Sequence, residues 1–461
     1  MFPFNVYDSR RKKLRSEISS GLVLFLGNQE VPFNYPSNTY TFRQDSCFSY
    51  FFGLDHPNLA GVIDLDEGKD YLFGDDVDID DIIWMGKQPT IKEQAAQVGV
   101  SNTAPLKDLN KFLHHVKTKG RALHYPPPYR GETFIQLTEL TGIPDSEIKE
   151  KASVDLIKGI IKLRMTKSDL EVKEIEKMVD VAYIMHTTAM KMAKPGVIEH
   201  EISGRIEGIA LSKGGMVSFP VILTINGQTL HNHYHGNKLM EGRMLVVDAG
   251  CESGLHYSSD ITRTVPVGGK FNSRQKGIYQ VVLDANLSAI KAVRPGMPFR
   301  DIHMLAATEI AKGLAGLGVM KGDPSEAVAK GAHTLFFPHG LGHPLGLDVH
   351  DLEGLGENLV GYDHEVQRSK EFGLAFLRFG RKLQQGFVMT IEPGIYFIPE
   401  LIDNWKTENK LAEFINYDVV ETYRDFGGIR IEDNVLVTET GSRVLGKPIP
   451  KTVPEIEEIM K

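Results

Sequence analysis

Cysteine is almost absent from this sequence: Cys47 and Cys251 are the only two in 461 residues. Two cysteines exclude a disulfide framework and a metal site built from cysteine alone, and they favour a reducing compartment. The sequence also lacks any run of about 18 apolar residues, and its N-terminus lacks the apolar core of a signal peptide. We therefore expect a cytoplasmic protein with no membrane segment.

An excess of basic residues is missing as well. The chain has 52 Lys and Arg against 60 Asp and Glu, a formal charge of −8. This balance excludes the basic footprint of a nucleic-acid-binding protein and a polybasic contact with a membrane. The length and a hydrophobic content of 41% suffice for two or three domains. The 16 histidines are spread unevenly, with four between residues 231 and 256 and four between residues 333 and 350.

The chain divides into two regions of different pattern. Short apolar runs alternate with polar segments in residues 1–156, including a predicted hairpin that turns at residues 66–69. This pattern predicts an N-terminal α/β domain. Ser168 and Glu171 then form a capping box, and apolar residues recur at helical spacing until Pro195-Gly196. That helix opens a second domain, residues 157–461, and the expected fold class is α+β.

The second domain contains two internal echoes. KPGVIEHEI (194–202) resembles RPGMPFRDI (294–302), and GRMLVVDAG (242–250) resembles GFVMTIEPG (386–394). The second pair predicts two buried strands, each tipped by a carboxylate. Together the echoes predict two related half-domains about an internal pseudo-twofold.

Four carboxylates interrupt or end apolar runs in this domain: Asp248, Asp260, Glu392 and Glu432. Acidic residues are depleted from strands and are rarely buried without a partner, so a strand-end acid facing water is a poor explanation for all four. Asp248 and Asp260 have the spacing of adjacent strands and can converge. Arg430 is two residues from Glu432 and shares its face of the strand.

The segment FPHGLGHPLGLDVHD carries three histidines, His339, His343 and His350. The first two are four residues apart, but the intervening glycines and Pro344 make a helix improbable, so a loop leading into a strand is expected. A packed or hydrogen-bonded histidine is the alternative to a metal ligand, and spacing alone does not choose among the three.

Four converging carboxylates would repel one another strongly in a buried cavity. Two divalent cations would neutralise them. One histidine with four carboxylates is an oxygen-rich ligand set, which favours Mn²⁺, with Co²⁺, Fe²⁺ or Zn²⁺ as alternatives. Because two metals can lower the pKa of a water held between them, the residues predict a dinuclear hydrolase.

The motifs VVDAG, SDITRT, PHGLGHPLGLDVHD, TIEPGIYF and GGIRIEDN, in this order, resemble the pita-bread metallopeptidases. That family includes methionine aminopeptidase, aminopeptidase P and prolidase. The resemblance implies a pita-bread fold for residues 157–461 and two bridging ligands, Asp260 and Glu432. The full implied ligand set is Asp248, Asp260, His343, Glu392 and Glu432.

The same resemblance assigns further roles. His231 and His350 would position the substrate and stabilise the tetrahedral intermediate. Glu392 would be both ligand and proton shuttle, and His339 would lie near the site. His233 and His235 stand where the family has small residues, so they put the substrate preference in doubt.

In the N-terminal region, YTFRQDSCFSYFFG and IWMGK look like the N-terminal domain of aminopeptidase P and prolidase, which methionine aminopeptidase lacks. The likeness favours proline-directed cleavage. It also implies a homodimer or homotetramer in which Trp84 reaches the neighbouring subunit's site. An ordinary core tryptophan is the alternative.

The segment GLAFLRFGRKLQQGFVMTIEPGIYF and the 40-residue interval from Glu392 to Glu432 are similar to prolidases of the animal type. The resemblance makes Arg378 the clamp for the free carboxylate of a dipeptide, a task that suits a guanidinium because it can bind a carboxylate bidentately. An arginine on a flexible surface loop is the alternative. Arg430 is also expected in the substrate site.

The leading prediction is therefore an Xaa-Pro dipeptidase in which a metal-bridging hydroxide attacks the carbonyl before proline. Aminopeptidase P, acting on longer Xaa-Pro peptides, is the first alternative. A non-catalytic pita-bread binding module or a metal-free amidinohydrolase would lack ligands that are present here. The expected substrates are proline-containing dipeptides or short peptides.

Overall fold

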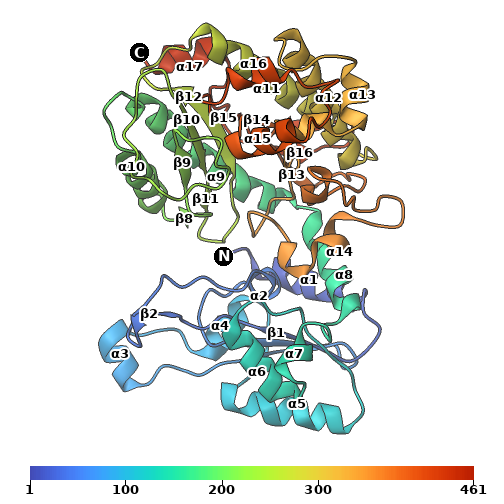
Figure 1. Ribbon diagram of the computed structural model, residues 1–461. Helices are drawn as coiled ribbons and strands as arrows, with labels where there is room; N and C mark the ends of the chain where they lie inside the picture. Colours follow the sequence, from blue (N-terminus) through green and yellow to red (C-terminus); the bar gives the residue numbers. More distant parts are fainter. The chain divides into compact units, whose positions relative to one another are not determined.

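The computed structural model describes residues 1–461, and the chain folds into two compact units (Figure 1). Unit 1 comprises Met1–Arg164 and Leu352–Leu359, and unit 2 comprises Met165–Asp351 and Val360–Lys461. The predicted domain boundary between residues 156 and 157 falls inside helix α8 (Val154–Met165) and stays a prediction. No helix combines the length and apolar character that crossing a bilayer would require.

Unit 1 is built on a five-stranded mixed sheet. Its elements are α1 (Phe4–Arg15), β1 (Leu22–Leu26), β2 (Pro32–Tyr35), β3 (Asn38–Thr39), α2 (Ser46–Phe52), β4 (Ala60–Asp64), β5 (Lys69–Phe73), α3 (Ile79–Met85), α4 (Ile91–Gln97), β6 (Asn102–Ala104), α5 (Leu109–Thr118), β7 (Leu123–His124), α6 (Gly131–Thr141), α7 (Asp145–Ile148) and α8.

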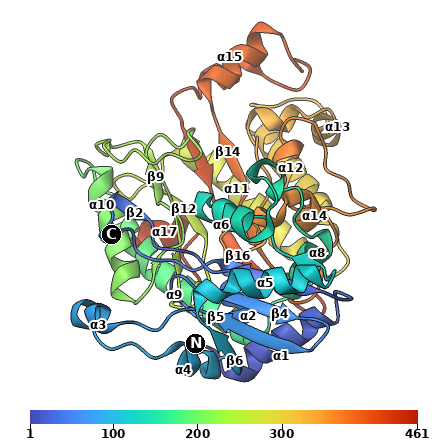
Figure 2. The same ribbon diagram turned by 90° about the horizontal axis from the view of Figure 1, so that it is seen from below.

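The strand order in this sheet is β6-β5-β4-β1-β7. The central strands β1 and β4 are buried along their whole length, as expected for apolar runs covered on both faces. Helices α1 and α2 lie on one face, and α5 and α6 lie on the other (Figures 1 and 2). The hairpin predicted at residues 66–69 is confirmed, because β4 pairs antiparallel with β5 from Asp64 and Lys69 outward.

Unit 2 contains the remaining elements. They are α9 (Asp169–Met192), α10 (Glu199–Ser212), β8 (Met216–Val217), β9 (Ile222–Thr224), β10 (Met244–Ala249), β11 (Cys251–Glu252), β12 (Ile261–Pro266), α11 (Ser273–Ala292), α12 (Phe299–Gly316), α13 (Pro324–Ala329), β13 (Val388–Ile391), β14 (Gly394–Tyr396), α15 (Pro399–Thr407), α16 (Tyr417–Glu421), β15 (Gly428–Arg430), β16 (Asp433–Val437), β17 (Ser442–Val444) and α17 (Val453–Ile459). The residues of α14 (Glu357–Gly361) are divided between the two units.

The predicted helix after Ser168 is confirmed as α9. Its capping box is formed, with the Ser168 amide donating to Glu171 Oε2 at 2.9 Å. The helix buries the apolar stripe that includes Val172, Ile175 and Met185. This buried face packs on β10, β11 and β12, so the helix gains stability from tertiary packing as well as from its cap.

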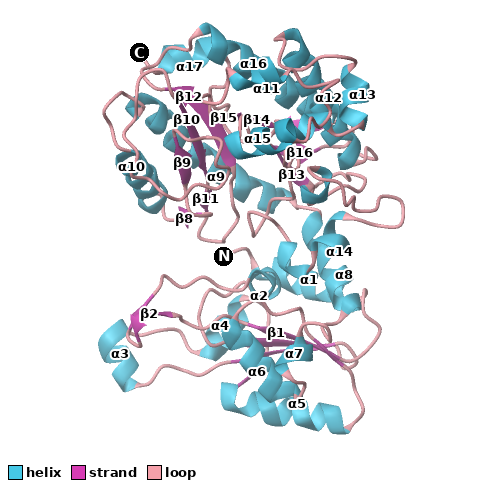
Figure 3. Cartoon of the chain, viewed as in Figure 1, coloured by secondary structure: helices cyan, strands magenta, loops and turns pink.

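The predicted internal repeat is present in unit 2. Helices α9 and α10 pack together and precede β10, and helices α11 and α12 pack together and precede β13. Each helix pair turns at a Pro-Gly whose glycine has positive φ, 95° at Gly196 and 81° at Gly296. The strands lie in the middle of the unit with helices outside them (Figure 3), while α15 lies at its periphery (Figure 2).

The four strand-associated carboxylates lie at the ends of the central strands. Asp248 is in β10 opposite Thr262 of β12, and Asp260 immediately precedes β12. Glu392 follows β13, and Glu432 lies between β15 and β16. Because β10 pairs with β12 and β13 pairs with β16, two strand pairs bring their acidic ends to one region.

Candidate metal centre and active site

A cavity of about 770 Å³ lies in unit 2 among these strand ends. The predicted site residues that line it are Asp248, Asp260, His343, Glu392, Glu432, His231, His339, His350, Arg378 and Arg430. His233 lines it too, and so do the aromatic residues Phe219, Phe372 and Phe376, which sequence reasoning did not select. The tertiary fold therefore gathers predicted residues that are up to 432 − 231 = 201 positions apart along the chain, from His231 to Glu432.

Three side chains form the tightest potential metal-binding group. Ligand atoms of Asp260, His343 and Glu432 all lie within 4.8 Å of one another, and all three residues are buried. The His343 Nε2 atom is 3.4 Å from Asp260 Oδ2 and 3.5 Å from Glu392 Oε1. Nδ1 of His343 donates to the Pro344 carbonyl at 3.0 Å. This bond leaves Nε2 facing the carboxylates, the orientation of a metal-ligating imidazole, which would bind the ion once the Nε2 proton is displaced.

Two buried carboxylate oxygens have no hydrogen-bond donor, Asp248 Oδ1 and Glu432 Oε1. Their partner oxygens are satisfied: Asp248 Oδ2 accepts from Arg430 at 2.7 Å, and Glu432 Oε2 accepts from the Thr262 hydroxyl at 2.7 Å. A buried acceptor without a donor is rare and costly. Each carboxylate is thus held by one oxygen while the other remains available, so these residues fit divalent cations.

The pKa values of the cavity carboxylates support the same conclusion. Burial, reinforced by neighbouring carboxylates, raises the pKa of Asp260 to about 6 and that of Glu392 to about 7. Burial and the nearby acids also hold the pKa of Glu432 well above its ordinary value. Without a cation these groups therefore retain their protons to a higher pH than ordinary carboxyl groups do. A divalent cation replaces those protons and removes the repulsion.

Arg430 organises one side of the cavity. Its buried guanidinium donates to Asp248, to the Tyr396 hydroxyl at 2.8 Å and to the Thr262 hydroxyl at 3.2 Å. Burial opposes its charge, but the neighbouring Tyr396 and Asp248 outweigh burial and hold the pKa of Arg430 well above its ordinary value. These bonds are to protein groups, so Arg430 orients a predicted ligand, and its substrate contact stays a prediction.

His339 extends this network. Burial lowers the pKa of its imidazole to about 3, with the Arg430 charge adding to the effect, so the ring is neutral. Its Nδ1 donates to the Gly340 carbonyl at 2.8 Å, and its Nε2 therefore accepts from the Tyr396 hydroxyl at 2.9 Å. Sequence reasoning did not select Tyr396 or Thr262 as site residues. The available signal for Tyr396 was its position within PGIYF, and the signal for Thr262 was its two-residue spacing from Asp260, which places both on one face of the strand.

The loop from His343 to His350 closes on itself. The Asp351 amide donates to the Pro344 carbonyl at 2.9 Å, and its carboxylate pairs with Lys167 at 2.8 Å, both side chains being 1% exposed. As a result the rings of His343 and His350 lie 4.2 Å apart between centroids, tilted by 63°. The prediction of a loop is confirmed, because no helix includes residues 337–350, but the strand expected after it is wrong: a short helical segment, α14, follows, and the next strand is β13.

His231 also lines the cavity. Burial, followed by the charge of Arg430, lowers the pKa of His231, so this ring is neutral at physiological pH. In the same segment His235 does not line the cavity, and its Nδ1 contacts the Leu223 carbonyl at 3.0 Å.

Trp84 lies in unit 1, in helix α3, and is 87% exposed. The alternative of an ordinary core tryptophan is therefore wrong. No residue of α3 is buried, and Ile79, Ile83 and Met85 are also more than half exposed.

Comparison with protein families gives two matches. Residues 173–439 match metallopeptidase family M24, and residues 7–124 match the aminopeptidase P N-terminal domain. The first match covers more than half of the chain and includes all five predicted ligands.

Individual relatives cover nearly the whole chain. The Xaa-Pro dipeptidase of Homo sapiens is 32% identical over 459 residues, which is 98% of this chain and 91% of that protein. A probable Xaa-Pro aminopeptidase of Pyrenophora teres f. teres is 31% identical over 422 residues, which is 91% of this chain and 87% of that protein.

Solved structures agree with this picture. Aminopeptidase PepP of Pseudomonas aeruginosa superimposes with a TM-score of 0.81 at 28% identity, covering 100% of this chain and 98% of that one. Zinc-substituted aminopeptidase P of E. coli, in complex with product, gives a TM-score of 0.82 at 27% identity with the same coverage. The α+β pita-bread architecture expected from the sequence is confirmed. The chain therefore belongs to metallopeptidase family M24, with an N-terminal domain of the aminopeptidase P type.

Proposed function

We propose that this protein is an Xaa-Pro dipeptidase that uses two divalent metal ions. The observation that carries the proposal is the convergence of five ligand side chains on one cavity, where Asp248 and Glu432 each keep one buried oxygen without a donor. The similarity to the human Xaa-Pro dipeptidase along nearly the whole chain supports the substrate class.

Two divalent ions held by these ligands would activate a water molecule and polarise the scissile carbonyl. Glu392, which lines the cavity beside His343, would receive and return the proton of the attacking water. The neutral His231 donates a hydrogen bond to the substrate. His350, against the ring of His343, supports the tetrahedral intermediate. His339 holds Tyr396 and, through it, Arg430.

Arg378, on the cavity wall, is the residue that would select substrates by length. A guanidinium there binds the C-terminal carboxylate that follows proline in a dipeptide. In a longer peptide that position is an uncharged amide. A charge-assisted hydrogen bond contributes about 1.5–3 kcal/mol, so Arg378 should favour binding of a dipeptide over a longer peptide by roughly 10- to 100-fold.

Cleavage of Ala-Pro beside Ala-Pro-Ala-Ala tests this assignment. Arg378→Ala should raise KM for Ala-Pro by about tenfold or more and change the tetrapeptide little. Arg443→Ala is the control, because Arg443 is an exposed arginine paired with Glu176 and does not line the cavity. Equal effects on both peptides would refute the clamp.

Aminopeptidase P activity is the second candidate, favoured by the likeness to the Pyrenophora relative and to the bacterial structures. Cleavage of the tetrapeptide alone by the unmodified chain would establish it and refute the dipeptidase proposal.

For the metal we propose Mn²⁺, with Co²⁺, Fe²⁺ or Zn²⁺ as alternatives, because four of the five ligands are carboxylates. Elemental analysis of the purified chain, followed by activity after each metal is restored, identifies the ion. A chain with neither metal nor activity would instead be a non-catalytic binding module.

We also propose a homodimer or homotetramer. Helix α3 exposes four large apolar side chains, among them Trp84, and a second copy of the chain would cover them. A cytoplasmic location fits the absence of any disulfide.

A further inference from the structure

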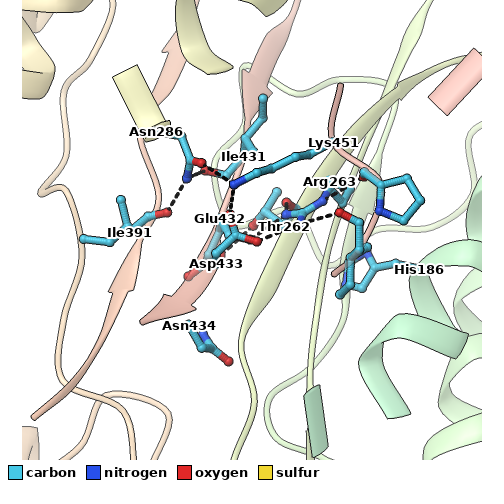
Figure 4. Close-up of polar contacts among 12 residues, drawn as sticks. His186, Thr262, Arg263, Asn286, Ile391, Ile431, Glu432, Asp433, Asn434 and Lys451 are labelled. Atoms are coloured by element: carbon cyan, nitrogen blue, oxygen red, sulfur yellow. Dashed lines mark hydrogen bonds and ion pairs between the residues drawn. The ribbon is translucent and has the colours of Figure 1, made fainter. Parts of the chain in front are cut away.

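A buried asparagine on helix α11 bonds to the backbone immediately before each of the two glutamate ligands. Asn286 is 0% exposed, and its Nδ2 donates to the Ile391 carbonyl at 3.0 Å and to the Ile431 carbonyl at 3.3 Å (Figure 4). These carbonyls belong to the residues immediately before Glu392 and Glu432. One amide group therefore bridges the backbones of two predicted ligands.

The orientation of this amide is fixed by Lys451. The Lys451 ammonium donates to Asn286 Oδ1 at 2.9 Å and to Asp433 Oδ2 at 2.7 Å. An ammonium can only donate, and two carbonyls can only accept. Oδ1 must therefore face Lys451, and both Nδ2 hydrogens must face the carbonyls.

Arg263 completes the support behind Glu432. It donates to the Glu432 carbonyl at 2.6 Å and to Asp433 Oδ1 at 2.7 Å (Figure 4). The Glu432 amide donates to the Thr262 carbonyl at 3.0 Å, so its backbone is held on both sides. The Glu392 amide is held by the Leu341 carbonyl at 2.8 Å. Asn286 is the side chain in this network that bonds to the backbone before both glutamates.

We propose that Asn286, oriented by Lys451, is a positioning residue for the metal pair: the pairing of Ile391 with Asp433 sets the spacing of the two backbones, and the Asn286 amide fixes the orientation of the peptides that lead into Glu392 and Glu432. The proposal rests on the ligand set proposed above. Metal ligands must be held to within about 0.5 Å of their working geometry. Loss of a partner outside the ligand shell typically weakens metal binding by about 10- to 100-fold.

Release of Mn²⁺ from the metal-loaded full chain into excess chelator tests the proposal. Asn286→Leu keeps the size of the side chain and removes the amide. Asn416→Leu is the matched control, because the Asn416 amide also donates to a backbone carbonyl, that of Gly318 at 2.9 Å, and neither residue lines the cavity. Both variants should lower the thermal unfolding midpoint.

Only Asn286→Leu should release Mn²⁺ about tenfold faster or more, and it should lower kcat for Ala-Pro with little change in KM. An Asn286→Leu variant that unfolds earlier and yet releases Mn²⁺ at the unmodified rate would overturn the proposal, because Asn286 would then only join strands.

A second pair of variants, at Lys451, tests the orientation of the Asn286 amide. It also keeps the proposal testable if the Asn286→Leu variant does not fold. Lys451→Met should speed Mn²⁺ release. Lys451→Arg retains a hydrogen-bond donor, so it should release Mn²⁺ nearly as slowly as the unmodified chain does. Equal release from both variants would overturn the proposal. An unmodified chain that holds no Mn²⁺, Co²⁺, Fe²⁺ or Zn²⁺ would overturn the ligand set as well, whereas a loaded chain insensitive to these substitutions would overturn this inference alone.

Discussion

Thr262→Val should weaken metal binding while changing the volume of the side chain little. Thr262 is fully buried, and its hydroxyl donates to Glu432 Oε2 at 2.7 Å. This bond lowers the pKa of Glu432 against the larger effect of burial, so its loss favours the protonated form that cannot bind metal. A hydrogen bond to a charged group contributes about 1.5–3 kcal/mol. At 1.4 kcal/mol per factor of ten, the metal Kd should rise about 10- to 100-fold.

Thr264→Val is the matched control. Thr264 lies on the same face of β12, two residues further on, and is also fully buried. Its hydroxyl donates to the Arg430 carbonyl at 2.9 Å and accepts from the Arg430 amide at 3.1 Å, so it supports backbone and not a ligand. Thr264→Val should cost about 1–3 kcal/mol of folding stability and change the metal Kd less than about threefold. Calorimetric titration of Mn²⁺ into each metal-depleted variant measures its metal Kd. Equal Kd values for the two variants would refute the reasoning.

Three further predictions concern pH, a buried ion pair and assembly. Asp260 and Glu392 have raised pKa values in the metal-free site, so their protonated forms stabilise the metal-free chain at low pH, and that contribution is lost as the pH rises from about 4 to about 7. The increase in the thermal unfolding midpoint on adding Mn²⁺ should therefore grow from pH 5 to pH 8. An increase that does not change with pH would contradict the assignment of these two residues as ligands. Lys167→Met removes the buried ammonium that donates to Asp351 and should lower the free energy of unfolding by about 1–3 kcal/mol in a urea titration, with a change below about 0.5 kcal/mol as the contrary result. Trp84→Ala should shift the chain toward smaller species in light scattering, whereas an unchanged mass would mean that Trp84 is outside the subunit interface.

The helical and strand elements near the site follow from local pattern. The capping box at Ser168 and the 3.6-residue spacing after it predict α9, and the Asp-Glu-Gly-Lys turn predicts the β4–β5 hairpin. Two-residue alternation places Thr262 and Asp260 on one face of β12. These patterns depend on a few consecutive residues, so the sequence is sufficient to predict them.

The roles of the arginines depend on contacts that no local pattern encodes. Arg430 is predicted as a substrate contact, yet its guanidinium donates to Asp248, 182 residues away. Trp84 could belong to a core or to a surface, and only its 87% exposure in the folded chain decides between them. Sequence spacing therefore does not determine which distant residue Arg430 contacts, or whether Trp84 is buried.

The sequence by itself determined which residue types could form the centre: four carboxylates at strand ends and a histidine in a glycine-rich loop, all within the region that matches family M24. Only the tertiary structure decided which oxygen of each carboxylate is held and which remains available. Asn286 reaches the Ile391 carbonyl across 105 residues, and Thr262 reaches Glu432 across 170. The physical reason is that ligand identity is a property of single residues, whereas ligand orientation arises from hydrogen bonds between strands and helices that meet only when the whole unit packs.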